Sequence, residues 1–407
     1  MALLACAPQP NAGSAEQRTI GDRCDQAGQW FDPATGRIVP HPEVFARLSE
    51  KRIILLGERH ASPEHHTWQL QVLAGLHASV DNLVVGFEAF PRAAQPVLNE
   101  WTRGGLTAEQ FLKAVQWNDV WGYPADLYMP MFDFSRQNRL SMLAINVDRA
   151  LISEVAQKGW QGIKADAREG VGDPASATEA YRLSLAKVYQ AKLRHPRSSL
   201  GKGEKQGSNA KLPELDQIMA NPRFGKFVEA QLTWDRAMAE ALAKASRAAP
   251  EATVVGILGR GHVEYGWGVP HQLAALGLKD VAFLLPTETG VSCRALQPGV
   301  ADTVFLVDPI EPAQDAPKKP KLGVVIEAAA AGIRVRRVVE GSVGADAALK
   351  PDDVITTAAG LPVRRNQDLI DIIQRQAPGT WLPLNVDRDG KTLQIIAKFP
   401  PDPGTSK

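Results

Sequence analysis

Five short apolar runs, separated by helical patterns, constrain the fold of this chain more than any other feature of its sequence. The runs cover residues 52–56, 82–87, 140–147, 252–258 and 280–285. Runs that are almost continuously apolar are typical of strands buried on both faces, and strands that alternate with helices form parallel sheets. We therefore predict that residues 21–305 form an α/β domain, in which helices cover both faces of a mostly parallel sheet.

Length and composition narrow the class of protein further. A chain of 407 residues is long enough for two domains and for a large hydrophobic core. The net charge of +1 excludes a nucleic-acid-binding protein with a strongly basic face. The three cysteines exclude a disulfide-dense scaffold and a zinc site made of four cysteines. No apolar run reaches the ~20 residues that a transmembrane helix needs.

The composition changes after residue 305, which marks a domain boundary. Four prolines lie between residues 307 and 320, so we predict a semi-rigid linker over 306–320. Beyond it, a helical pattern at 366–377 is surrounded by strand-like runs at 322–326, 333–339, 353–356, 382–386 and 392–398. We predict a small, mostly β domain over 321–400, followed by a tail over 401–407.

The N-terminus resembles the lipidation motif of bacterial lipoproteins. Leu3, Leu4 and Ala5 precede Cys6, and a stretch with Pro, Gly and Ser follows, as between a lipid anchor and its domain. We predict that residues 1–20 are a truncated lipoprotein signal and tether, and that Cys6 carries the lipid. Cys24 and Cys293 are either a disulfide pair or two inert thiols, and the sequence leaves both open.

Polar side chains follow four of the predicted strands, at the edge where a doubly wound sheet binds its ligands. They are Glu58 and His60 after the first run, Glu88 after the second, Asn146 at the end of the third with Asp148 and Arg149 after it, and His262 after the fourth. Two carboxylates and two imidazoles suit a divalent metal such as zinc or manganese, or an acid/base site. The alternatives are structural: Glu58 pairs with Arg59 or Arg149, and His262 is a hydrogen-bonded turn residue.

Three further features lie near this edge or next to it in the sequence. Ser62 and Pro63 predict the start of a helix, in which at least one of His65 and His66 is expected to be solvated or to cap the helix. An aromatic stretch is expected to be core, or else to wall a flat apolar ligand. It consists of Trp101, Trp117, Trp121, Tyr123, Phe132 and Phe134. A basic insert at 194–213 is expected to be a solvated loop, or a lid over an anionic ligand.

An ordered set of motifs over about residues 25–290 resembles the ChaN family of haem-uptake lipoproteins. It comprises Gly57-Glu58-Arg59-His60 with His65-His66, Gly86-Phe87-Glu88-Ala89-Phe90, Trp117 with Trp121, Tyr128 with Pro130, Asn146 before Arg149, Gln231, Asp235, Met238 and Ala239, and Gly259-Arg260-Gly261-His262. The wider superfamily includes TIKI-type metalloproteases and erythromycin-esterase-like proteins, which use the Glu-x-His and Gly-x-x-His elements for hydrolysis.

The second predicted domain resembles the PDZ domains of HtrA-type proteases. The resemblance rests on Leu322-Gly323-Val324, Gly341-Ser342 with Ala345, Ala347-Ala348-Leu349, Asp352-Asp353-Val354-Ile355, Gly360 with Val363, and the helix from Asn366. Peptide binding is then expected at Leu322, Gly323, Val324, Ile370 and Ile373, by addition of a strand to the sheet edge. The Ala328–Ala331 run departs from the pattern, and a PDZ fold that binds no peptide is the alternative.

Together the resemblances imply an iron-regulated haem-binding lipoprotein that faces the periplasm, most readily on the outer membrane. Its partners would be haem, a C-terminal peptide or envelope protein, and the membrane, with a homodimer left open and no nucleic acid. The residues suggested for haem are His60, His65, His262 and Tyr265. The first alternative is a metal-dependent hydrolase that uses Glu58, His60, Glu88 and His262 as ligands or catalytic groups. The second alternative is an envelope scaffold that acts through its PDZ domain.

Overall fold

A computed structural model describes residues 24–194, 212–309 and 320–401, in two compact units that comprise residues 1–309 and 310–407. The predicted lipidation site Cys6 and nearly all of the basic insert lie outside the described residues. Within the described residues, no helix is long and apolar enough to cross a membrane.

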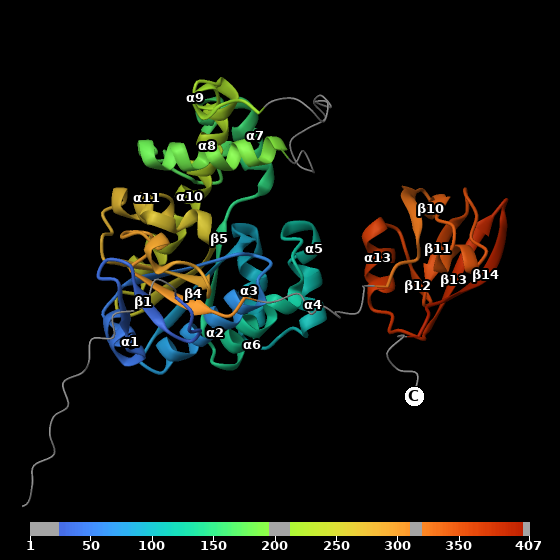
Figure 1. Cartoon of the computed structure of the whole chain (residues 1–407), viewed down its shortest axis with the longest axis horizontal. Coiled ribbons are helices and arrows are strands. Elements are labelled where there is room, and N and C mark those ends of the chain that lie inside the picture. The colour runs from blue at the N-terminus through green and yellow to red at the C-terminus, as the bar shows by residue number, and fades with distance from the viewer. Residues whose placement is uncertain (1–23, 195–211, 310–319, 402–407) are drawn as a thin grey trace, which may run out of the picture. The chain divides into compact units, whose positions relative to one another are not determined.

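The first unit is built on an eight-stranded sheet (Figure 1). Its strands, in spatial order, are β2 (Arg37–Val39), β1 (Trp30–Asp32), β8 (Thr303–Val307), β7 (Val281–Glu288), β3 (Ile53–Glu58), β6 (Thr253–Gly259), β4 (Leu83–Pro91) and β5 (Ser141–Asn146). The six strands from β8 to β5 are parallel, and β1 and β2 add to them in antiparallel pairs. The predicted α/β sheet is confirmed, and β8 extends the first unit two residues past the predicted boundary at 305.

Helices cover both faces of this sheet. Alternate residues of the central strands point to opposite sides, and because both sets are apolar, each face packs against helices. Ile54 and Leu56 of β3 belong to one apolar core, and Ile53 and Leu55 belong to another. The first core is closed by α1 (His41–Ser49), α2 (Pro63–His77), α3 (Gln95–Thr102), α4 (Ala108–Ala114), α5 (Trp117–Val120) and α6 (Met129–Gln137). The second is closed by α10 (Pro222–Ala248) and α11 (Val269–Ala275).

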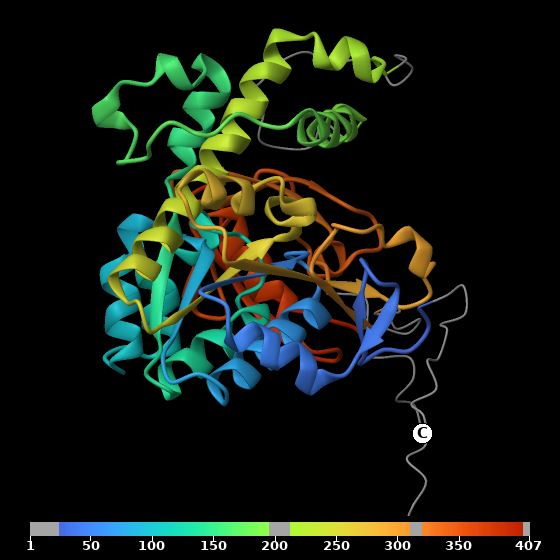
Figure 2. The same cartoon turned by 90° about the vertical axis from the view of Figure 1, so that its left-hand side faces the viewer.

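The long helix α10 also carries a helical layer that projects beyond the sheet (Figure 2). Its later residues Met238 and Leu242 pack on the sheet, while its early residues Phe224 and Phe227 belong to a separate apolar cluster. That layer contains α7 (Arg149–Lys158), α8 (Glu179–Arg194) and α9 (Leu215–Met219). Helix α10 thereby links the projecting layer directly to the carboxyl edge of the strands.

A disulfide joins the beginning of the described chain to the segment between β7 and β8. Cys24 and Cys293 have their Cα atoms 5.2 Å apart, and the bond spans 269 residues. The backbone of Cys24 also exchanges hydrogen bonds with Val291 and Gly290. Of the two possibilities that the sequence left open, the structure therefore shows the disulfide pair.

The described part of the second unit is a six-stranded antiparallel sheet with one substantial helix. Its elements are β9 (Val324–Ala329), β10 (Gly332–Val338), α12 (Val343–Asp346), β11 (Val354–Ala358), β12 (Leu361–Pro362), α13 (Asn366–Gln374), β13 (Trp381–Arg388) and β14 (Lys391–Lys398). The predicted small β domain is confirmed. Strand β9 is at one edge of this sheet, so one side of its backbone has no neighbouring strand in the described part of the unit.

Candidate functional site

Glu58, His60, Glu88 and His262 lie together at the carboxyl edge of the parallel strands. Strands β3, β6 and β4 are neighbours, so the ends that carry these residues are adjacent. Glu58 is the last residue of β3 and lies opposite Gly259, the last residue of β6. Glu88 lies where the pairing of β4 with β5 becomes irregular, and His262 ends the 3-10 helix Arg260–His262 that follows β6.

Glu58 and His60 form a close carboxylate–imidazole pair. Nδ1 of His60 lies 2.5 Å from Oε1 of Glu58, and the Tyr128 hydroxyl donates to the same oxygen over 3.4 Å. The other oxygen of Glu58, Oε2, is buried and has no hydrogen-bond partner among the described residues. Burial raises the pKa of Glu58, and the hydrogen bond with His60 offsets only part of that effect. Burial alone would lower the pKa of His60, but Glu58 and Glu88 raise it overall.

Glu88 and His262 form a second pair, which a buried aspartate extends. Oε2 of Glu88 accepts the Gly259 N–H over 2.6 Å, and Oε1 lies 3.5 Å from Nε2 of His262. Nδ1 of His262 lies 2.6 Å from Oδ1 of Asp235 on α10, and the Tyr181 hydroxyl donates to Oδ2 over 2.8 Å. Although burial lowers the pKa of His262, the charges of Glu88 and Asp235 raise it to about 9.

Asp235 was not among the predicted site residues, although it belongs to the motifs that carried the family resemblance. Its side chain is fully buried on a helix face that otherwise holds Met238, Ala239 and Leu242. A carboxylate in an apolar helical stripe is rarely buried without a partner. That mismatch between residue type and helix face was the signal that could have identified Asp235.

Asn146 at the end of β5 holds the backbone of this edge. Its side-chain amide donates to the Glu88 carbonyl over 2.8 Å, and its side-chain oxygen accepts the Trp234 indole N–H over 2.5 Å. Hydrogen bonds of Asn146 on β5 with Glu88 on β4 and with Trp234 on α10 therefore stabilise the backbone at this edge.

The predicted aromatic stretch divides between the core and the rim of this edge. Trp101, Trp117, Trp121 and Phe132 are buried in the first apolar core, and Phe134 packs against it. The rings of Trp121 and Tyr123 lie 4.8 and 5.0 Å from the ring of His60, and Tyr123 is only half-buried. Burial and the nearby carboxylates Glu58 and Glu88 raise the pKa of Tyr123. We call His60, Trp121 and Tyr123 the ring cluster.

The expectation that His65 or His66 would be solvated or cap the helix is wrong, because both side chains are buried. Nδ1 of His65 accepts the Arg59 N–H over 3.0 Å, and burial lowers the pKa of His65 to about 4. His66 contacts the side chain of Gln69 and the carbonyl of His60. The predicted helix start is confirmed: Ser62 caps α2 and Pro63 is its first residue.

Tyr265, the remaining residue suggested for haem, stacks on Trp267 with 4.4 Å between ring centroids. Its φ of 56° is uncommon for a residue other than glycine. Its phenol takes part in no hydrogen bond within the described chain. In the described residues, Tyr265 thus makes no hydrogen bond or ion pair with Glu58, His60, Glu88 or His262.

Neither structural alternative for Glu58 is seen. Arg59 pairs with Glu288, 2.5 Å away, and Arg149 donates to the Trp121 carbonyl over 3.3 Å. In residues 24–194, 212–309 and 320–401, no group of three or more His, Cys, Asp or Glu side chains is arranged to hold a metal ion. Glu58 and His60 form a hydrogen-bonded pair, Glu88 and His262 lie at ion-pair distance, and metal binding by these four residues stays a prediction.

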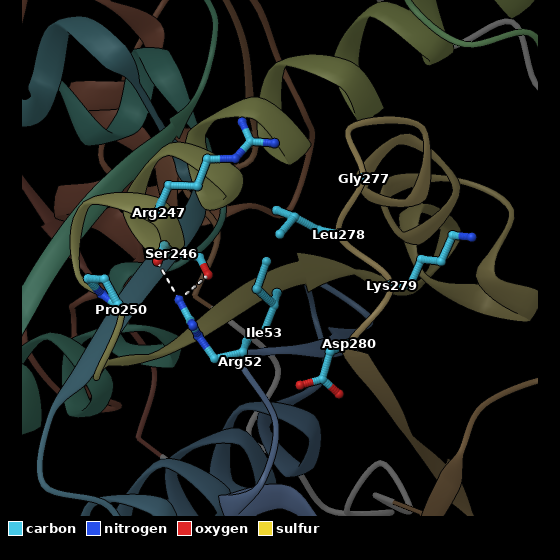
Figure 3. A pocket seen from close by; sticks show the side chains of 9 residues that line it. All are labelled: Arg52, Ile53, Ser246, Arg247, Pro250, Gly277, Leu278, Lys279 and Asp280. Carbon is cyan, nitrogen blue, oxygen red and sulfur yellow. Dashed lines mark hydrogen bonds between the residues drawn. The ribbon is translucent and has the colours of Figure 1, made fainter.

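A cavity of about 540 Å³ lies at the other end of the strands (Figure 3). It is lined by Ile53 at the start of β3, by Ser246 and Arg247 near the end of α10, and by Lys279 and Asp280 before β7. Arg52 also lines it and donates to the carbonyl and hydroxyl of Ser246. Its lining includes none of the predicted site residues.

In the second unit, the residues predicted to bind peptide surround the start of β9 and one face of α13. Leu322 and Ile373 are buried in the core of this unit, whereas Val324 and Ile370 are half-buried. Gly323 has a φ of +73°, and a Cβ atom there would lie 2.2 Å from Cβ of Ser342. Helix α13 packs beside β9. The Ala328–Ala331 run forms the end of β9 and the turn into β10, so it does not interrupt the strand pairing.

Comparisons with known proteins agree with this architecture. The family model described as "Haem-binding uptake, Tiki superfamily, ChaN" matches residues 44–273, and the PDZ domain model matches residues 320–398. No curated protein matches the chain.

Among solved structures, a ChaN from Campylobacter jejuni, described as binding haem cofacially, has a TM-score of 0.50 at 17% identity. The match covers 68% of this chain and 95% of that one. An erythromycin esterase mutant has a TM-score of 0.35 at 13% identity, covering 64% and 77% of the two chains. The HtrA3 PDZ domain bound to a phage-derived ligand has a TM-score of 0.18 at 20% identity, covering 20% and 84%. Because the first family model spans more than half of its residues, this chain belongs to the ChaN family of haem-binding uptake proteins in the Tiki superfamily, and it also carries a PDZ domain.

Proposed function

We propose that this protein is an iron-regulated, haem-binding lipoprotein that takes part in haem uptake at the cell envelope, with haem bound at the carboxyl edge of the first unit. The observation that carries the proposal is the hydrogen bonding of the His60 imidazole, which leaves one ring nitrogen without a partner in the described residues. Its Nδ1 is held by the buried Glu58 carboxylate, while Nε2 has no hydrogen-bond partner among the described residues. A histidine that ligates a metal usually donates its other ring N–H to such a carboxylate.

The residues at this edge fit a haem. Imidazole and phenolate are both known axial ligands of haem iron, and aromatic rings suit its flat face. Of the four suggested residues, His65 is buried and His262 has both ring nitrogens beside carboxylates. His60 and Tyr265 keep a free donor atom, and His60 lies within the ring cluster. When bound, haem would supply the iron centre, while His60 would orient it and Glu58 would hold the His60 tautomer.

The test is a haem titration of the full chain followed by absorption spectroscopy. We expect His60→Ala to lose the Soret band of the bound form, whereas the matched control His77→Ala on α2 should keep it. If Tyr265→Phe loses the Soret band while His60→Ala keeps it, the iron ligand is Tyr265 and not His60. The absence of binding by the unmodified protein would contradict the proposed function.

A metal-dependent hydrolase is the second candidate. It is favoured by the two successive hydrogen bonds that connect Tyr181 to Asp235 and Asp235 to His262. A buried carboxylate that holds an imidazole next to a second carboxylate is an arrangement used in acid/base catalysis. Metal analysis for zinc and manganese, together with assays of ester and peptide hydrolysis, tests this candidate. Turnover that disappears in both His262→Ala and Glu58→Gln would support it over haem binding.

We further propose that Cys6 anchors the protein in the outer membrane, facing the periplasm, and that the PDZ domain binds C-terminal peptides of envelope proteins. The lipidation motif supports the anchor, and the edge position of β9 supports strand addition. Replacing Cys6 with Ser behind a native leader should release the protein into the soluble fraction. Unchanged membrane association would contradict the anchor.

A further inference from the structure

Three arginines follow the strands at the carboxyl edge, and Arg149 differs from the other two in its ion pairing within the described residues. Arg59 follows β3 and pairs with Glu288, and Arg260 follows β6 and pairs with Glu264. Arg149 follows β5 and has no carboxylate within salt-bridge distance in the described parts of the chain. Its side chain makes one hydrogen bond, from Nη2 to the Trp121 carbonyl over 3.3 Å. Arg149 is an exposed residue, and most donors of its guanidinium have no partner among the described residues.

The neighbours of Arg149 do not neutralise it. The side chain of Asp148 caps α7 by accepting the Ala150 N–H over 2.7 Å. The carboxylate of Glu169 accepts the backbone N–H of Asp148 over 3.1 Å. Neither of these two acids forms an ion pair with Arg149 in the described residues, and its positive charge stays available to a ligand.

Arg149 lies at the rim of the ring cluster. Its hydrogen-bond acceptor, Trp121, has its ring 4.8 Å from that of His60. Its charge also acts on Tyr123: burial and the carboxylates Glu58 and Glu88 raise the pKa of this phenol, and Arg149 opposes them. A ligand that covers the ring cluster would therefore lie within reach of this guanidinium.

The distribution of charge at the carboxyl edge determines which part of a ligand faces the interior of the edge and which part faces Arg149 at its rim. The interior of the edge holds three carboxylates, those of Glu58, Glu88 and Asp235, which would repel an anionic group. The rim holds an exposed guanidinium, whose planar donors match a carboxylate in a two-point contact. An anionic ligand group should thus face the rim, while the uncharged part faces His60, Trp121 and Tyr123.

We propose that Arg149 binds a carboxylate of the ligand at the ring cluster and so sets its orientation, which for haem means that a propionate lies at Arg149. This inference rests on the proposed haem binding, because it assigns the contact of the haem carboxylates. Arg59 and Arg260 do not share the role, since their own carboxylate partners already neutralise them.

The experiment compares haem with its dimethyl ester, which keeps the iron and the ring but lacks both carboxylates. Binding of each is measured by absorption titration for the unmodified protein, for Arg149→Gln and for Arg103→Gln. Arg103 is a matched control because it is also exposed and donates to one backbone carbonyl, that of Asn99. Melting curves of the three proteins check that the fold is intact.

We expect the unmodified protein and Arg103→Gln to bind haem roughly tenfold or more tightly than the diester, which is the usual strength of a charge-assisted contact. Arg149→Gln should bind both forms with the affinity that the unmodified protein has for the diester. Equal binding of the two forms by the unmodified protein, or preserved discrimination in Arg149→Gln, would overturn the role of Arg149 while leaving haem binding intact. Failure of the unmodified protein to bind either form would overturn the proposed function and this inference together.

Discussion

At the scale of single residues, the close approach of His60 to β6 makes Gly259 a sensitive backbone position of the edge. A Cβ atom on Gly259 would lie 2.8 Å from Cε1 and 3.0 Å from Nε2 of His60. The φ of Gly259 is −62°, so alanine is allowed by the backbone and the clash falls on the imidazole. We expect Gly259→Ala to push His60 away from Glu58 and to weaken haem binding roughly tenfold or more.

The matched control for that substitution is Gly261→Ala, two residues along the chain. A Cβ atom on Gly261 would have no described atom within 4 Å beyond those of its two chain neighbours. Haem titration of both variants tests the expectation, and circular dichroism checks their folds. Equal haem affinity of the two variants would show that the position of the His60 ring does not matter for binding.

The second prediction at this scale concerns the pH dependence of stability through His262. Its pKa is about 9 in the folded chain, where Glu88 and Asp235 outweigh the effect of burial, against 6.5 for an unperturbed histidine. A raised folded pKa stabilises the fold fully below pH 6.5, and this contribution disappears as the pH rises through 9. We expect a loss of up to about 3 kcal/mol over this interval, measured by urea unfolding. His262→Gln should be less stable at neutral pH, and its stability should change less over the interval.

At the scale of elements, strand placement and the gathering of the edge residues could be predicted from sequence, because both follow from one rule. Apolar runs identify buried strands, and parallel strands bring their final residues to one edge. The partner of His262 could not be placed in this way, since Asp235 comes from the middle of α10 and meets the edge only through helix packing. Strands β1 and β2 also escaped prediction, because each has three residues and carries little periodicity.

The peptide groove of the second unit gives the third prediction. Ile370 lies half-buried on α13, the helix beside the edge strand β9. If a C-terminal peptide adds to β9, its apolar last residues should lose contact area in Ile370→Ser. Because burying an aliphatic side chain is worth about 1.5–3 kcal/mol, we expect roughly a tenfold or greater loss of affinity in fluorescence titrations with peptides. Gln374→Ser, on an exposed position of the same helix, should bind as the unmodified protein does.

Gly323 is a poor position for testing the same groove. Its positive φ and the 2.2 Å approach of a Cβ atom to Ser342 mean that any side chain strains the fold of this unit. Lost peptide binding in Gly323→Val would therefore report unfolding as readily as a blocked groove. Unchanged peptide affinity in Ile370→Ser would contradict a groove between β9 and α13.

At the scale of the whole molecule, the division into two units follows from the change in composition at the proline-rich segment. The predicted boundary at 305 falls within β8, which extends to Val307 before the prolines begin. The disulfide could not be predicted, since Cys24 and Cys293 are 269 residues apart and only the pairing of the chain near Val291 brings them together. The boundary is thus a local property of the sequence, whereas the disulfide is a property of the fold.

The last prediction follows from where the cysteines lie. Both residues of the disulfide belong to the first unit, and the chain has no cysteine after residue 293. A disulfide that closes a long loop stabilises a fold by about 2–4 kcal/mol, largely by restricting the unfolded chain. We expect calorimetry of the full chain to show two transitions, of which only that of the first unit falls in temperature when Cys24 and Cys293 are both replaced with Ser. Adding a reductant to the unmodified protein should lower the same transition and leave the doubly substituted variant unchanged. A reductant effect on the variant, or an equal shift of both transitions, would show that the disulfide does not act on the first unit alone.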